Sequence, residues 1–128
     1  GTIKVGDTAA YLWPGTQAVT NGVFPDPGTP PAYFRIQQPC LMSGIAAGLA
    51  GAAGTGNSVT LLVKHTPIST GTLADTAFTV TFGASDLAKT FYNASLRLNT
   101  GDRIHVYITY TGDNDNTAHD LTVQLDLY

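Results

Sequence analysis

The side chains that could carry out chemistry in this 128-residue chain are nine aspartates, three histidines and one cysteine, and there is no glutamate. Hydrolysis of a glycosidic bond needs two carboxyl groups held about 5–10 Å apart across a cleft. Most of these aspartates instead lie in expected turns, where aspartate is favoured for backbone reasons. We therefore expect no catalytic residue and no enzyme. The aspartates are Asp7, Asp26, Asp75, Asp86, Asp102, Asp113, Asp115, Asp120 and Asp126.

The histidines and the cysteine also lack the spacing that chemistry requires. Zinc needs ligands that converge, but His65, His105 and His119 lie on three separate segments with no paired spacing. No neighbouring base is evident that would activate the thiol of Cys40, which we expect to be a small buried apolar residue. A Gly-x-Ser-x-Gly nucleophile motif is absent from the sequence. We therefore expect structural roles for these four residues.

One short segment has the composition of a calcium loop. Gly112 is followed by four residues with side-chain oxygen atoms, which are Asp113, Asn114, Asp115 and Asn116. Alternating oxygen ligands in a tight loop suit calcium, although the spaced glutamate of an EF-hand loop is missing. A solvated hairpin tip is the alternative. Calcium is thus the one cofactor that the sequence suggests, and no other is expected.

Three aromatic residues accompany a long proline-rich segment. Tyr11, Trp13 and Phe24 flank or lie within residues 14–31, which carry five of the seven prolines. Loops of this length in a compact domain are often functional or pack across a neighbour. Exposed aromatic rings there could stack on sugar rings. Alternatively, they plug the end of the fold or cover a neighbouring surface.

Composition bounds the size and the partners of the protein. At 128 residues there is room for one domain, with a net charge of −3 and only 12% charged residues. No basic surface for nucleic acid is expected, and no apolar run approaches the roughly 18–20 residues of a membrane span. A neutral surface rich in hydroxyl groups is typical of extracellular and virion β-proteins. Because the chain starts at Gly1 without methionine, we expect a processed product or the C-terminal part of a longer chain.

Apolar and polar residues alternate in many short segments, which indicates half-buried strands. By this parity Leu87 and Phe91 point into the core, whereas His105 points outward. Gly44 and Gly48 within residues 41–50 indicate a strand packed closely against another backbone. With long loops between the segments, we expect an all-β antiparallel jelly-roll β-sandwich of about eight to ten strands. The whole chain, 1–128, forms one domain in which 1–31 is a short N-terminal strand and a proline-rich arm. The expected strands lie within 2–13, 32–37, 41–50, 58–65, 76–82, 87–92, 96–98, 103–110 and 121–128.

The segment from Leu96 to Val106 reads L-x-L-x-x-G-D-x-I-x-V. It resembles the penultimate hairpin of the C1q/TNF-like jelly-roll domains, in which a Leu-x-Leu strand turns through Gly-Asp into the next strand. The whole pattern is similar to head domains that cap trimeric viral, phage or spore-surface fibres. This resemblance implies a homotrimer that binds through exposed loops or through grooves between protomers. Tyrosine and arginine are favoured at interfaces, so the candidate interface residues are Tyr33, Arg35, Arg103, His105, Tyr107, Gln124 and Tyr128.

Three functions are compatible with these observations. The first is a non-enzymatic trimeric head domain on a virion or cell surface, which attaches to a host-surface glycan or protein receptor. The second is a monomeric carbohydrate-binding module of a secreted enzyme. The third is a capsid or decoration jelly roll with a structural role only. In the first case the contact surface would be the loops at 14–31, 51–57, 66–75 and 112–118.

Overall fold

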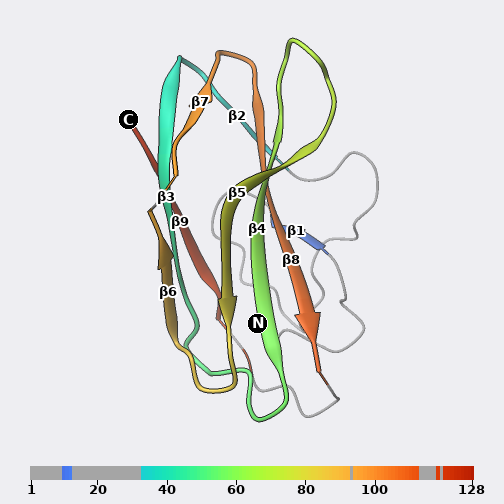
Figure 1. Ribbon diagram of the computed structural model, residues 1–128, viewed down its shortest axis with the longest axis vertical. Helices are drawn as coiled ribbons and strands as arrows, with labels where there is room; N and C mark the ends of the chain where they lie inside the picture. Colours follow the sequence, from blue (N-terminus) through green and yellow to red (C-terminus); the bar gives the residue numbers. More distant parts are fainter. Residues whose placement is uncertain (1–9, 13–32, 93, 113–117, 119) are drawn as a thin grey trace.

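The computed structural model describes residues 10–12, 33–92, 94–112, 118 and 120–128. Over these residues the chain forms two antiparallel β-sheets that lie face to face (Figure 1). The described strands are β1 (Ala10–Leu12), β2 (Phe34–Arg35), β3 (Cys40–Gly48), β4 (Ser58–Thr66), β5 (Ala74–Phe82), β6 (Ala88–Phe91), β7 (Leu96–Leu98), β8 (Arg103–Thr111) and β9 (Thr122–Leu127). The predicted all-β antiparallel sandwich is therefore confirmed.

The two sheets differ in their number of strands and in how the strands are paired. The first sheet has the order β1, β8, β4, β5, and β2 also pairs with β8. In the second sheet β3 is central, because β9 pairs along one of its edges while β6 and β7 pair along the other. The chain crosses between the sheets from β2 to β3, from β3 to β4, from β5 to β6, from β7 to β8 and from β8 to β9. Repeated crossing of this kind is how jelly rolls are wound.

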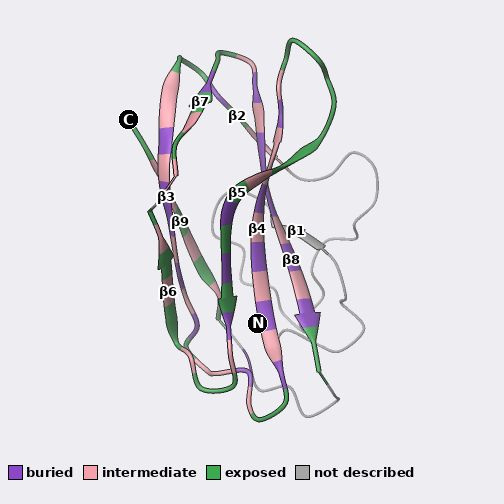
Figure 2. Cartoon of the chain, viewed as in Figure 1, coloured by how far each residue is buried: buried purple, intermediate pink, exposed green. Residues whose placement is uncertain are grey.

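The core lies between the sheets and follows the predicted parity (Figure 2). In β4, Val59, Leu61 and Val63 are fully buried, whereas the intervening residues are only half-buried. Burying such a side chain contributes about 1.5–3 kcal/mol. The same alternation buries inward residues of β5 and β8, namely Phe78, Val80, Phe82, Ile104, Val106, Ile108 and Tyr110. No helix in this part of the chain has the length and hydropathy needed to cross a membrane.

A β-bulge explains the unusual pattern of β3, which is apolar at both parities. Met42 pairs with Leu127, and the next pair along the strands joins Gly44 to Asp126. Ser43 is therefore an extra residue, and it shifts the inward parity. As a result Met42 and Ile45 are both fully buried although they are three positions apart, a spacing that places residues on opposite faces of a regular strand.

The structure corrects several details of the sequence prediction. His105 lies on the outer face as predicted, but it is only 2% exposed, so it is not available as an interface residue. Leu87 was assigned to the core, but it is 50% exposed because β6 begins only at Ala88. The close approach predicted at Gly44 involves the Tyr92 side chain rather than a backbone. Cys40, expected to be buried, is half-buried and packs against the core.

Candidate functional site

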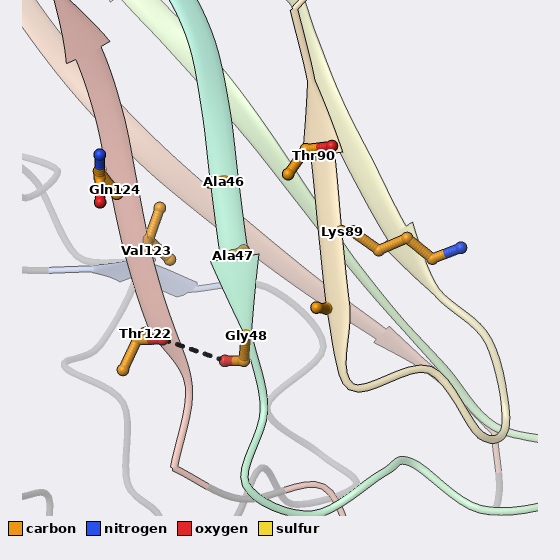
Figure 3. Close-up of a pocket in the computed structure, with 9 residues that line it drawn as sticks. Ala46, Ala47, Gly48, Lys89, Thr90, Thr122, Val123 and Gln124 are labelled. Carbon is orange, nitrogen blue, oxygen red and sulfur yellow. Dashed lines mark hydrogen bonds between the residues drawn. The ribbon is translucent and has the colours of Figure 1, made fainter.

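An open hollow of about 360 Å³ lies on the second sheet (Figure 3). Its floor is formed by small residues of the central strand, Ala46 and Gly48. Strand register places Gln124 and Thr90 on either side of Ala46, and Thr122 beside Gly48. Residues directly opposite each other across paired strands share a face of the sheet. Short side chains in the middle and longer ones on the flanks therefore produce the depression.

The aromatic ring of Tyr92 lies on the same outer face, over the backbone of Gly44. A Cβ atom at Gly44 would collide with this ring, so glycine is required for the close approach. Tyr92 is 49% exposed. Its hydroxyl donates to the Asp126 carboxylate, and this hydrogen bond, together with burial, raises the pKa of Tyr92 above its usual value. Asp126 also accepts a 2.9 Å hydrogen bond from Nε2 of Gln124, so this carboxylate orients two side chains beside the hollow.

The hollow and its surroundings carry groups that could contact a ligand. A half-exposed tyrosine ring provides an apolar surface with a polar tip, and the adjacent Thr90, Thr122 and Gln124 carry hydrogen-bonding groups. The nearest cation, Lys89, points away from the hollow (Figure 3) and pairs with Asp86 at 3.1 Å. Within the described ranges, no group of three or more His, Cys, Asp or Glu side chains is arranged to hold a metal. The surface is suited to a neutral, hydroxyl-bearing ligand.

A second surface lies on the outer face of the first sheet, and we call it the first-sheet patch. Four of the seven predicted interface residues lie at this surface, namely Tyr33, Arg35, Arg103 and Tyr107. The Tyr33 ring centroid lies 5.9 Å from that of His105 and 5.2 Å from the guanidinium carbon of Arg103. Lys64 Nζ lies 4.3 Å from the Tyr107 ring centroid. His105 is buried beneath this surface, where its Nε2 lies 2.9 Å from the Thr66 hydroxyl.

A buried carboxylate, that of Asp102, joins three segments at one end of the first sheet. Its Oδ1 accepts a 2.9 Å hydrogen bond from the backbone N–H of Ile68. Its Oδ2 accepts one from the backbone N–H of Asn99 at 2.9 Å and lies 2.8 Å from Nε2 of His65. Asp102 is 1% exposed. The turn preceding it is possible because Gly101 has a φ of 92°, a conformation that favours glycine.

The environment of Asp102 determines its protonation. Burial alone would raise the pKa of this carboxyl group. The hydrogen bonds from Asn99, Ile68 and His65, together with the charge of His65, outweigh that effect and hold the pKa below its usual value. Asp102 is therefore ionised in the folded protein at neutral pH. These hydrogen bonds make Asp102 a clamp between β4, the loop that follows it and the turn before β8.

The other predicted site residues are dispersed or lie outside the described residues. Gln124 lines the hollow of the second sheet, and Tyr128, 73% exposed, forms backbone hydrogen bonds with Leu41. Tyr11 belongs to β1, where its backbone pairs with Tyr107. The remaining candidates, which lie outside the described residues, are Trp13, Phe24, Asp113, Asn114, Asp115 and Asn116.

The sequence prediction missed the most informative residues beside the second-sheet hollow and around Asp102. Tyr92 and Asp126 act together although they are 34 positions apart, and the pairing of β3 with both β6 and β9 brings them near each other. The Gly101–Asp102 dipeptide was identified, but only as a turn. In the sequence, Asp102 is distinguished only by its position directly after a glycine. Nothing in the sequence distinguishes its partners His65 and Ile68.

Comparisons with known proteins do not add an identification. No protein-family model, curated protein or solved structure matches the chain.

Proposed function

We propose that the protein is a non-enzymatic, trimeric head domain, displayed on a virion or cell surface, that attaches to a host-surface glycan or protein receptor. The observation that carries the proposal is the first-sheet patch. Tyrosine and arginine are enriched at protein interfaces, and four of the candidate interface residues, Tyr33, Arg35, Arg103 and Tyr107, lie together there. The antiparallel sandwich and the turn at Gly101–Asp102 support the same resemblance.

The first test is the mass of the protein in solution, measured by light scattering on a sizing column. A mass three times the 13.4 kDa of one chain is expected. The measurement is repeated with a calcium chelator, because calcium at Asp113–Asn116 is part of the proposal. A trimer that dissociates only with the chelator would support that metal site, whereas a monomer under all conditions would refute the trimeric head.

We propose that a glycan binds at the hollow of the second sheet and that a sugar ring stacks on Tyr92, which lies beside the hollow. Aromatic side chains contribute strongly where they anchor an interface, so Tyr92→Ala should weaken binding on a glycan array about tenfold or more. Tyr128→Ala is the matched control, because Tyr128 is also exposed but lies away from the hollow. Equal binding by both variants would contradict this assignment.

The same hollow also favours a second candidate function, a monomeric carbohydrate-binding module of a secreted enzyme. Tyr92, Gln124 and Thr90 would serve that function without any neighbouring protomer. The mass measurement separates the two candidates. A monomer that binds glycans through Tyr92 would establish the module and exclude the head domain.

A further inference from the structure

Two arginines face each other directly on the first-sheet patch. Arg35 of β2 and Arg103 of β8 are partners in the strand register, so their side chains leave the same face of the sheet. Like charges placed directly opposite each other across two strands are destabilising. Arg103 contacts the Tyr33 ring, while Arg35 is exposed. None of the ion pairs among the described residues includes either arginine. The single chain therefore holds a concentrated positive charge at this edge.

A carboxylate lies toward the opposite edge of the same sheet. Asp75 is the only aspartate within a described strand of the first sheet, and β5, to which it belongs, lies at the far end of the strand order from β2. Its side chain is 68% exposed and lies 3.4 Å from Nζ of Lys64. An exposed ion pair of this kind contributes little to stability. Exchanging Lys64 for another cation would therefore cost little stability at Asp75.

Other carboxylates in the described part of the chain are less suited to an outside partner. Asp102 is buried and accepts hydrogen bonds from three segments. Asp86 accepts from the backbone N–H of Gly83 and pairs with Lys89. Asp126 is hydrogen-bonded to Gln124 on the other sheet.

We propose that in the assembled protein the Arg35–Arg103 pair of one protomer binds the Asp75 carboxylate of a neighbouring protomer. This inference rests on the proposed trimeric function. One face that carries two arginines at one edge and an exposed carboxylate at the other suits a head-to-tail contact between different patches, which closes a ring when repeated. Two guanidinium groups also match a planar carboxylate through paired hydrogen bonds. The carboxylate would offset the repulsion between Arg35 and Arg103 that remains in each single chain.

Charge reversal tests the contact. Arg35→Asp and Asp75→Arg are prepared singly and together, and the dissociation constant of the assembly is measured by light scattering over a dilution series. Each single change is expected to weaken assembly roughly tenfold or more, and the double change to restore it. Arg97→Asp is the matched control, because Arg97 is an exposed arginine of β7 on the second sheet. Thermal unfolding of each variant checks that it remains folded.

The outcomes separate this contact from the proposed function. A trimer that the single reversals leave unchanged would overturn the Arg35–Asp75 contact while the trimeric head stands. A wild-type monomer would overturn both. A wild-type dimer, weakened by each single reversal and restored by the double, would support the contact and refute the trimer. Single reversals that weaken assembly without restoration in the double variant would also overturn the specific pairing.

Discussion

The Asp102 clamp offers the sharpest test of how this fold is held together. Replacing Asp102 with alanine removes both carboxylate oxygens and leaves the backbone N–H groups of Ile68 and Asn99 without their acceptor. His65 loses its partner at 2.8 Å. The loop after β4 then has no side-chain hydrogen bond to the turn before β8.

The expected loss follows from these contacts. A hydrogen bond to a charged group contributes about 1.5–3 kcal/mol, and contributions within one network do not simply add. Each buried backbone N–H that is left without an acceptor costs a further amount of about 1–3 kcal/mol. We expect Asp102→Ala to lower the free energy of unfolding by about 3–5 kcal/mol, which for a domain of this size lowers Tm by roughly 10–20 °C.

Asp102→Asn separates the contributions of the two carboxylate oxygens. The Asn side chain retains one acceptor oxygen, which can serve Ile68. Its NH₂ group would replace the oxygen that accepts from the backbone N–H of Asn99, so two donors would face each other there. We therefore expect Asn to preserve little of the stability that Asp provides, although the two side chains have nearly the same shape.

Equilibrium unfolding in urea, followed by circular dichroism, provides the measurement. Because the folded-state pKa of Asp102 is lowered, its contribution is complete above the unfolded-state pKa and is lost as the pH falls through the folded-state value. The stability difference between wild type and Asp102→Ala should therefore be constant near neutral pH and shrink as the pH falls below about 5, through the lowered folded-state pKa. Arg97→Ala, at an exposed position of β7, should change stability by no more than about 0.5 kcal/mol.

Two results would refute this reasoning. One is a loss of less than about 1 kcal/mol for Asp102→Ala at neutral pH, since even one buried hydrogen bond to a charged group exceeds that value. The other is a stability difference that remains constant on acidification.

Two further changes test the turn and the core. Gly101→Ala should lower the free energy of unfolding by about 1–3 kcal/mol, because the φ of 92° is strained for alanine and the new methyl group would meet Ile68. Gly56→Ala is the control, since Gly56 has a φ of 80° but open space around it, and it should cost less in the same urea titration. Phe78→Ala should cost about 3–5 kcal/mol by thermal and urea unfolding, because Phe78 is 1% exposed. Leu87→Ala, at a 50% exposed position, should have little effect, and comparable losses for these two apolar residues would argue against the assigned core.

The sequence predicted the strands well where a strand has one buried and one outer face. Val59, Leu61 and Val63 show this, because a simple alternation is sufficient to assign their direction. The prediction was less complete for β3, where the extra residue Ser43 shifts the parity in mid-strand. No single-sequence pattern indicates such a bulge, because it is defined by the partner strand β9.

The sites were harder to predict because they depend on contacts between distant segments. His105 has the parity of an outer residue, yet the outer face is covered at that point by Tyr33. The hollow of the second sheet combines three strands, and its floor consists of Ala46 and Gly48, which carry no chemical signal of their own. In contrast, the clustering of tyrosine and arginine on β2 and β8 could be predicted, because these residues alternate within single strands.

The central position of β3 also determines when this protein can fold during its synthesis. Gly48 pairs with Ala88 and Met42 pairs with Leu127, so the partners of β3 follow it by 40 to 85 residues. The first sheet likewise depends on β8, which joins β2 to β4. Neither sheet can therefore be completed until β8 and β9 have left the ribosome, and folding of such non-local topologies takes on the order of milliseconds to seconds. Until then the apolar residues of β3 remain without their sheet partners, which makes the nascent chain a candidate for chaperone binding.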